Sequence, residues 1–138
     1  MIQRIQSVYL ILGVLALAGA VLLGDLTREA HDAVAWFVPA AAGAMGLAAL
    51  MGMVGLFLYS NRKRQRRAIV LTQYVTLVCL VVVILGLNAS GTLPTTKEMA
   101  IDGWLILAFP LLGYVFFWLA RRGVDADIKL LKSVDRLR

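Results

Sequence analysis

The sequence predicts an all-α membrane protein: a four-transmembrane-helix bundle followed by a C-terminal cytoplasmic amphipathic helix. Three observations lead to this fold class. Of the 138 residues, 61% are hydrophobic and only 16% are charged, whereas charged residues make up about 25% of an ordinary soluble domain. Four long apolar runs are spaced along the chain. Basic residues gather at those ends of the runs that would share one side of a membrane.

Each apolar run is long enough, or nearly so, to cross a membrane as a helix. About 20 apolar residues span about 30 Å of hydrocarbon, and we predict spans at about 7–24, 36–59, 68–89 and 103–120. None of these runs contains Asp, Glu, Lys, Arg or His. They are not predicted to be strands, because polar and apolar residues do not alternate as they must in a membrane barrel. The four spans define a transmembrane domain of residues 1–122.

The first two spans have features that bear on retention and packing. The first span continues for several apolar residues beyond Ala20, where a signal-peptide cleavage site would fall, so we expect it to be retained. The second span has Pro39 in its first turn, a position that tolerates proline. It also carries small residues at successive four-residue steps, which form a ridge where another helix can approach closely. The predicted helix-packing residues are Ala40, Ala44, Ala48 and Gly52.

The third span contains most of the polar residues found within the spans. We expect Thr72, Gln73, Thr76 and Asn88 to form hydrogen bonds to a neighbouring helix, as such groups usually do in membrane bundles. The fourth span contains Pro110, which membrane helices tolerate when neighbouring groups satisfy the freed carbonyl. No charged side chain lies within any span, which argues against proton-coupled transport.

The distribution of basic residues predicts the orientation of the bundle. Four spans place the N-terminus, the stretch SNRKRQRRA at 60–68 and the C-terminal tail on one side of the membrane. Twelve of the 14 Lys and Arg residues lie on that side, and only Arg28 and Lys97 lie on the other. Such an excess marks the cytoplasmic side. Both termini are therefore predicted to be cytoplasmic, and 60–68 is predicted to be a short cytoplasmic loop between the second and third spans.

We interpret most of these basic residues as groups that contact anionic lipid headgroups at the membrane surface. Nucleic-acid binding is not expected, because no aromatic or polar readout residues accompany the charges of the 60–68 loop, which is held at the bilayer surface. Trp118, near the inner end of the fourth span, fits an interfacial depth. The predicted lipid-contact residues are Arg62, Lys63, Arg64, Arg66, Arg67, Arg121, Arg122, Lys129 and Lys132.

Residues 123–138 are predicted to form the cytoplasmic amphipathic helix. Apolar residues recur there at spacings of three and four, on one helical face, at Val124, Ile128, Leu131, Val134 and Leu137. Asp125 with Lys129, and Lys132 with Asp135, are expected to pair within the helix. We expect this helix to lie on the inner leaflet with its apolar face toward the lipid. The alternative is a docking helix for a partner protein.

Few residues have the chemistry of a catalytic or metal site. The sequence shows no nucleophile–base set, phosphate-cradling glycine loop or Cys/His cluster. The outer loop holds Asp25, Glu29, His31 and Asp32, which could ligate a metal, but a solvent-exposed loop needs polar residues in any case. We therefore predict no catalytic, cofactor-binding or metal-binding residue and no cofactor, and we do not expect an enzyme.

The two ends of the chain resemble those of a known family. The opening MIQRIQSVYL, the four spans and the closing KSVDRLR are similar to a family of small integral membrane proteins of unknown function found in Bacteroidota, the domain of unknown function 4293. The resemblance covers the full length. It implies four spans and a bacterial inner membrane, and it supplies no activity, ligand or site residues.

Together these observations predict a multi-pass protein of the bacterial inner membrane. Our first hypothesis is a non-enzymatic accessory or scaffold subunit that presents a basic cytoplasmic surface to lipid or to a protein partner. The expected partners are the lipid bilayer and either another membrane protein or further copies of this chain, with no nucleic acid. The alternative is a small transporter or channel for a neutral or passively conducted solute.

Overall fold

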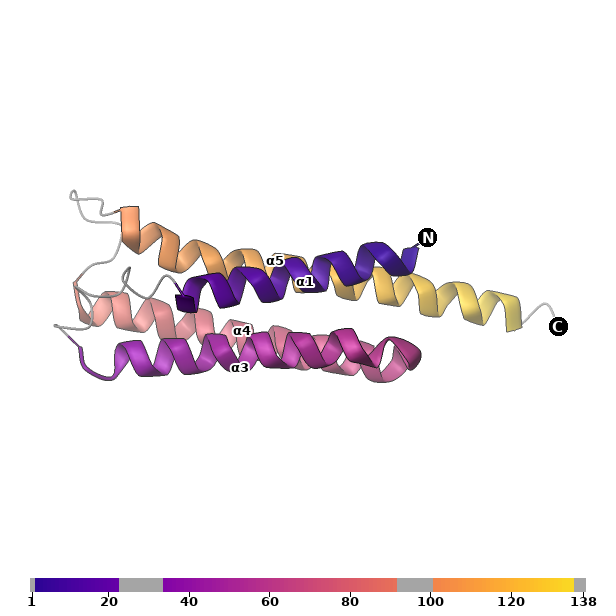
Figure 1. The fold of residues 1–138 in the computed structure, drawn as a ribbon, viewed down its shortest axis with the longest axis horizontal. Helices are drawn as coiled ribbons and strands as arrows, with labels where there is room; N and C mark the ends of the chain where they lie inside the picture. Colours follow the sequence, from indigo (N-terminus) through magenta and orange to yellow (C-terminus); the bar gives the residue numbers. More distant parts are fainter. Residues whose placement is uncertain (1, 23–33, 92–100, 136–138) are drawn as a thin grey trace.

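The computed structural model describes residues 2–22, 34–91 and 101–135. Within these residues the chain is all-α and forms a four-helix bundle (Figure 1). Its elements are α1 (Ile2–Leu22), α3 (Phe37–Phe57), a short 3₁₀ helix η2 (Leu58–Ser60), α4 (Arg62–Ala89) and α5 (Ile101–Asp135). Successive long helices run in opposite directions, so the two termini lie at the same end of the bundle. The predicted fold class is confirmed as an all-α four-helix bundle.

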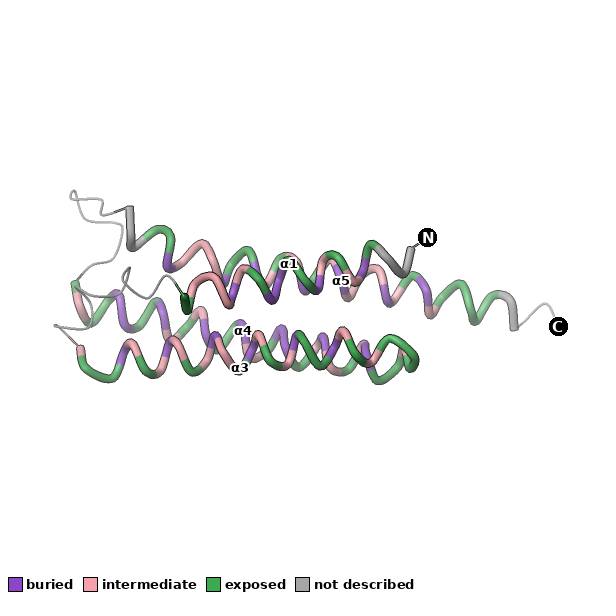
Figure 2. The backbone as a smooth tube through the Cα atoms, in the orientation of Figure 1, coloured by how far each residue is buried: buried purple, intermediate pink, exposed green. Residues whose placement is uncertain are grey.

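The four helices pack in a ring. α1 contacts α3 and α5, and α4 contacts the same two helices. Each helix therefore has an inner face against its neighbours and an outer face toward the surroundings. Figure 2 shows buried residues on the inner faces and exposed residues on the outer faces. All four helices are long and apolar enough to cross a membrane, which makes the chain a multi-pass membrane protein.

The outer faces of the bundle carry large apolar side chains. Leu15 on α1, Leu50 on α3, Val81 on α4 and Leu111 on α5 are each more than half exposed. In water a continuous apolar surface of this kind promotes aggregation, whereas in a bilayer it is the surface that lipid tails cover. The outer faces therefore fit the environment that the sequence predicts.

Glycines allow two phenylalanine rings to enter the core. Phe117 of α5 is fully buried, and a Cβ atom at Gly13 of α1 or Gly52 of α3 would lie 2.8 Å or 3.0 Å from its ring. Phe37 of α3 is also fully buried, in space that a Cβ atom at Gly86 of α4 would overlap. Small residues at helix interfaces permit this close approach. The two rings together join all four helices.

The buried stripe of α3 differs from the predicted ridge of small residues. Ala48 and Gly52 are buried, but Ala40 and Ala44 lie half-buried at the edge of the interface. With 3.6 residues per turn, a row of residues four apart turns by about 40° around the helix at each step. A seam that stays on one side must therefore mix steps of four with steps of three. The observed seam does so, at Phe37, Ala41, Met45, Ala48, Gly52 and Gly55.

α4 begins earlier than the third predicted span. Of the stretch 60–68, which the sequence predicts to be a loop, only the first two residues connect α3 to α4. Asn61 is extended, with φ and ψ of −123° and 92°, and its side-chain oxygen accepts a hydrogen bond of 3.2 Å from the backbone N–H of Arg64. This is the geometry of a helix N-cap. The loop prediction is therefore wrong for 62–68, because Asn61 starts the helix.

α5 is one continuous helix across the predicted boundary between residues 122 and 123. Its buried residues follow steps of four and three from the span into the tail, at Ile106, Pro110, Gly113, Phe117, Ala120, Val124 and Asp127. Because the buried residues of the tail lie on the same side of the helix as those of the span, the helix continues straight. The tail therefore extends along the bundle axis and beyond the other helices (Figure 1). The structure thus joins the predicted tail helix to the fourth span as one helix. Residues 136–138 lie outside the described residues.

Candidate functional site at the basic end of the bundle

The predicted lipid-contact residues all fall at one end of the bundle, which we call the basic end. It comprises the start of α1, the η2 turn, residues 62–68 of α4 and the part of α5 from Trp118 onward. Figure 1 shows this end on the right, where both termini lie. The structure divides its nine predicted cations into two groups, those that pair with carboxylates and those that remain exposed.

The start of α4 concentrates positive charge. Residues 62–67 include five basic residues, and the first turn of the helix contains no acidic residue. The N-terminus of a helix already carries about half a positive charge from its peptide dipoles, so these cations are unfavourable there unless anions lie nearby. Gln65, in the middle of the segment, is buried, and its Nε2 donates to the backbone carbonyl of Gly55 on α3 at 3.2 Å. This bond orients the helix so that neighbouring arginines lie beside α5.

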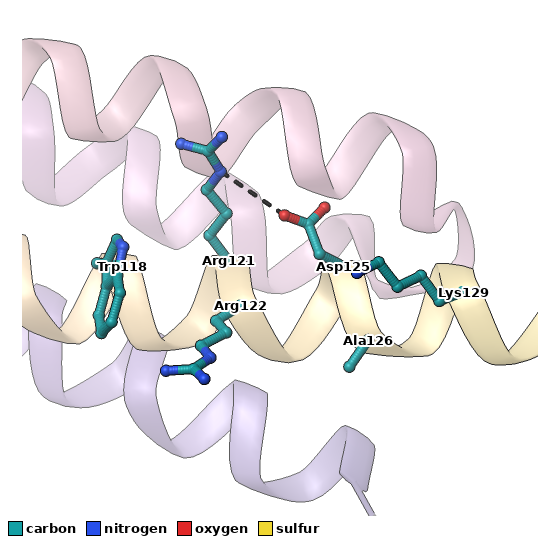
Figure 3. A pocket seen from close by; sticks show the side chains of 6 residues that line it. All are labelled: Trp118, Arg121, Arg122, Asp125, Ala126 and Lys129. Carbon is teal, nitrogen blue, oxygen red and sulfur yellow. Dashed lines mark ion pairs between the residues drawn. The ribbon is translucent and has the colours of Figure 1, made fainter.

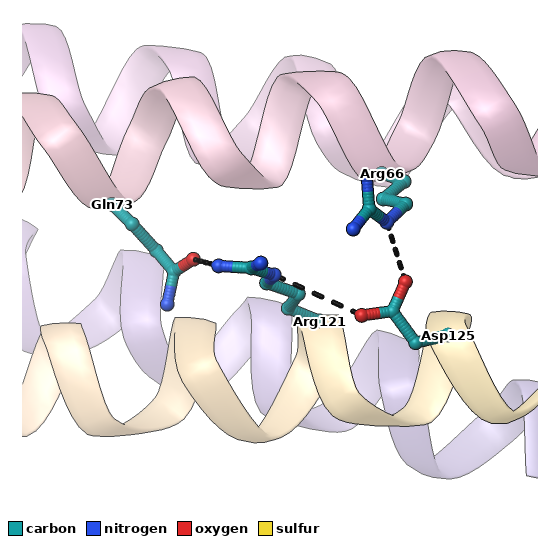
Figure 4. Close-up of polar contacts among 4 residues, drawn as sticks. All are labelled: Arg66, Gln73, Arg121 and Asp125. Atoms are coloured by element: carbon teal, nitrogen blue, oxygen red, sulfur yellow. Dashed lines mark hydrogen bonds and ion pairs between the residues drawn. The ribbon is translucent and has the colours of Figure 1, made fainter.

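Two aspartates on α5 supply the missing negative charge. Asp127 pairs with Arg62 at 3.3 Å, and only 7% of the Asp127 side chain is exposed. Asp125 pairs with Arg66 at 2.5 Å and with Arg121 at 3.8 Å. We call these five side chains the α4–α5 clasp. Figure 4 shows the carboxylate of Asp125 between the two arginines.

The clasp is connected to the core by a hydrogen bond to the buried Gln73 of α4. Arg121 donates from Nη1 to the Oε1 of Gln73 at 3.3 Å, and Gln73 is buried (Figure 4). The Asp125 pairs are partly exposed, and such pairs contribute about 0–1 kcal/mol. Asp127 differs, because a buried carboxylate that loses its partner costs several kcal/mol. The clasp therefore depends mainly on the pair between Arg62 and Asp127.

The expectation that Thr72 and Thr76 bond a neighbouring helix is wrong. Their hydroxyl groups donate to the backbone carbonyls of Ala68 and Thr72, at 2.9 Å and 2.8 Å, one turn earlier in α4. Bonds of this kind satisfy a buried hydroxyl within its own helix. Of the four polar residues expected to link helices, Gln73 does so, through Arg121, and Asn88 is exposed.

Six of the nine predicted cations lie outside the clasp. Five of them are exposed and form no ion pair with any side chain that the structure describes: Lys63, Arg64, Arg67, Lys129 and Lys132. The sixth is Arg122, which is also exposed and whose guanidinium carbon lies 5.6 Å from the centre of the Trp118 ring. This is a cation–π distance. These six side chains are available to an anion outside the protein.

Two shallow hollows lie beside α5 at the basic end. The first has a volume of about 420 Å³ and is lined by Trp118, Arg121, Arg122, Asp125, Ala126 and Lys129 (Figure 3). The second has a volume of about 560 Å³ and is lined by Ser60, Asn61, Arg62, Lys63, Ile128, Leu131 and Lys132. Both combine apolar surface with several cations. Guanidinium and ammonium groups of this kind bind phosphate through charge-assisted hydrogen bonds.

Metal-ligating side chains are not gathered in the part of the chain that the structure describes. Within that part, no group of three or more His, Cys, Asp or Glu side chains could hold a metal ion. The outer-loop residues Asp25, Glu29, His31 and Asp32 lie outside it. Cys79 is a buried free thiol in α4. The cations of the basic end are thus the main chemical feature of the described residues.

The predicted pair of Asp125 with Lys129 is wrong, and the predicted pair of Lys132 with Asp135 lies outside the described side chains. The sequence spacing predicts that Asp125 pairs with Lys129, whereas the structure pairs Asp125 with arginines of α4 and α5. One signal in the sequence points to the clasp: Val124 and Asp127 continue the seam of the fourth span at steps of four and three, which places Asp127 on the inner face. A carboxylate on an inner face needs a cation from a neighbouring helix.

Comparison with protein families identifies a match over most of the chain. The model of a family described as a domain of unknown function (DUF4293) matches residues 20–137. That range contains α3, α4, α5 and the closing KSVDRL, and it leaves out the opening MIQRIQ. No curated protein and no solved structure matches the chain.

Proposed function

The chain belongs to the DUF4293 family of domains of unknown function, as the resemblance predicts, and we propose that it is a non-enzymatic accessory or scaffold protein of the bacterial inner membrane. The basic end then lies in the cytoplasm and presents its cations to anionic lipid headgroups or to an acidic surface of a membrane-protein partner. One observation carries this proposal: the clasp occupies three cations of the basic end, and six others are exposed around it.

Charge asymmetry supports the cytoplasmic placement of the basic end. Twelve of the 14 basic residues belong to this end and to the adjoining chain termini. Cytoplasmic segments beside membrane spans carry such an excess of Lys and Arg. Tyr59, Tyr74 and Trp118 are exposed at the same end, and amphipathic aromatic rings favour the membrane interface.

The extension of α5 supports a docking role. It continues beyond the other helices (Figure 1), and its Leu130 and Leu131 are 55% and 51% exposed among lysines. Asp125 and Asp127 hold the start of this extension against α4. A helix that is fixed in direction and that carries apolar and basic side chains suits binding to a membrane surface or to another protein.

Purification in mild detergent from the native membrane tests the proposal. The wild type is compared with a triple variant, Lys63→Gln, Arg64→Gln and Arg67→Gln, which removes three exposed cations and leaves the clasp intact. We expect the wild type to retain anionic phospholipid or an acidic protein in fixed stoichiometry, and the triple variant to lose most of it. Leu50→Ala, on the outer face of α3, is the control and should behave as the wild type.

A defined pair of results would reject the accessory role. If the purified chain retains neither anionic lipid nor a partner, and liposomes that contain it take up a solute that empty liposomes exclude, the accessory role is wrong. The alternative of a small transporter or channel would then replace it.

A further inference from the structure

One face of α5 changes in character along its length. Leu111, Val115 and Trp118 lie on this face and are 52%, 43% and 45% exposed. Arg122 and Lys129 continue the same face and are also exposed, because residues three, four or seven apart share one side of a helix. The face thus passes from apolar side chains through an indole ring to two cations. This is the order in which a bilayer passes from hydrocarbon to headgroups.

The hollow of about 420 Å³ lies on the basic part of this face. Figure 3 shows Arg121 and Asp125 directed toward α4 and Arg122 directed to the other side of α5, and all three residues line the hollow. Every residue that lines it belongs to α5. The hollow therefore exists because α5 remains helical through the predicted boundary, so that one continuous face spans the hydrocarbon edge and the headgroup level.

The charges of the hollow leave a surplus that favours an anion. Its one carboxylate, Asp125, is already bound by Arg66 and Arg121. Arg122 and Lys129 form no ion pair with the side chains that the structure describes. A phosphate group is thus attracted by two uncompensated cations and meets a carboxylate whose charge is compensated.

Trp118 fixes the position of the Arg122 guanidinium. The guanidinium carbon lies 5.6 Å from the centre of the indole ring, and this contact orders a side chain that otherwise moves freely. The N–H groups of the guanidinium remain available, and a planar guanidinium binds phosphate through two parallel hydrogen bonds. Lys129 adds a flexible point charge to the same hollow.

We propose that this face of α5 binds one anionic glycerophospholipid. Its phosphate lies between Arg122 and Lys129, Trp118 lies at the hydrocarbon boundary, and an acyl chain follows Val115 and Leu111. The apolar part of the face favours a lipid over a free anion, because it offers the acyl chain a surface continuous with the phosphate site. The inference rests on the proposed function for the placement of the basic end at the headgroups, and it adds a defined lipid site to that general basic surface.

Trp118 itself can report on the site. Trp36 and Trp104, the other two tryptophans, lie at the opposite end and are about half exposed, so Trp36→Phe and Trp104→Phe leave Trp118 as the sole indole. The full chain is reconstituted in phosphatidylcholine vesicles that contain a fixed fraction of phosphatidylglycerol with brominated acyl chains. Bromine quenches an indole that it contacts. For each variant, quenching is measured as the ratio of Trp118 fluorescence in vesicles with brominated phosphatidylglycerol to that in vesicles with unbrominated phosphatidylglycerol. Any change that a substitution itself causes in Trp118 fluorescence is the same in both and cancels in the ratio.

The expected result distinguishes binding of anionic lipid at this site from attraction of anionic lipid to the whole basic end. Phosphatidylglycerol should be enriched beside Trp118 above its fraction in the vesicle. Arg122→Gln should lower the preference for phosphatidylglycerol over phosphatidylcholine about fivefold. Arg67→Gln makes the same change in charge at an exposed position of the basic end outside the hollow, and it should lower the preference beside Trp118 much less than Arg122→Gln does.

Three results would overturn the site. Equal losses in Arg122→Gln and Arg67→Gln would replace it with a diffuse basic surface and leave the proposed function standing. No enrichment beside Trp118 in the chain with Arg122 intact would remove the site, and the proposed function would then rest on the exposed cations outside the hollow. Inorganic phosphate, exchanged for chloride at equal ionic strength, should not change the quenching; displacement by phosphate would identify a soluble anion as the occupant.

Discussion

Asp127 is the residue on which the geometry of the basic end most depends. It lies on the inner face of α5 with 7% of its side chain exposed, and it pairs with Arg62. Arg62 is the first residue of α4. One ion pair thus joins the beginning of α4 to the point where α5 leaves the bundle. Because the carboxylate is buried, its charge needs a partner, whereas the partly exposed pairs of Asp125 contribute less.

Removal of Arg62 should therefore destabilise the bundle, while removal of its neighbour should not. We expect Arg62→Gln to lower the free energy of unfolding by about 3–5 kcal/mol, because it leaves the buried Asp127 without an ion pair. Lys63→Gln, an exposed position outside the clasp, should change it by less than about 0.5 kcal/mol. Unfolding in a denaturing detergent, followed by circular dichroism, measures both. Adding Asp127→Asn to Arg62→Gln should recover part of the loss; equal stability of the two single variants would show that the pair contributes nothing.

The glycines offer a second comparison at the residue scale. A Cβ atom at Gly86 would overlap the ring of Phe37, whereas a Cβ atom at Gly43 of α3 would meet no atom within 4 Å. Gly86→Ala should therefore cost about 1–3 kcal/mol through overpacking, and Gly43→Ala should be neutral or slightly stabilising, since alanine is the better helix former. Melting temperatures in detergent provide the test. If the two variants melt together, Phe37 does not pack against α4 as described.

At the scale of elements, the apolar runs are sufficient to predict four helices, because a span must satisfy its own backbone within a helix. They are not sufficient to predict where two of the helices begin or end. The charges of 62–67 suggest a solvated loop, yet Asn61 caps a helix there. The seam of α5 is hard to recognise because Pro110, Gly113 and Asp127 occupy inner positions without being large and apolar.

The sequence predicts the location of the candidate site but not the pairing of its side chains. A count of basic residues along the four predicted spans places all nine cations on one side of the membrane. It does not divide them into paired and exposed groups, because the clasp joins residues far apart in sequence: Arg66 and Asp125 are 59 positions apart. Only the packing of α4 on α5 brings those residues together.

Continuity of α5 is the prediction that belongs to this scale. Spin labels at Leu112→Cys and Leu130→Cys, two exposed positions of α5, should lie about 27 Å apart along one straight helix. The same pair would lie about 19 Å apart if the helix turned through a right angle near residue 122 to lie on the membrane surface. Cys79→Ala removes the native thiol beforehand. Pulsed electron paramagnetic resonance in nanodiscs separates the two distances, and a single short distance would restore the surface helix in place of the extension.

At the scale of the whole molecule, apolar side chains line the outer faces of the helices and cations concentrate at one end. A bilayer accommodates the first feature, and the cytoplasmic leaflet attracts the second. The clasp lets α5 leave the bundle in one fixed direction while six cations stay exposed. Both the accessory role and the lipid site therefore depend on the side of the membrane that the basic end faces.

Labelling of single cysteines measures that side directly. In a Cys79→Ala background, Lys132→Cys lies at the basic end and Ala35→Cys at the other, and both positions are exposed. A maleimide that does not cross membranes is added to intact spheroplasts and, separately, to lysed ones. With the basic end in the cytoplasm, Ala35→Cys is labelled in both samples and Lys132→Cys only after lysis. Labelling of Lys132→Cys in intact spheroplasts would place the basic end outside the cytoplasm and contradict the proposed function.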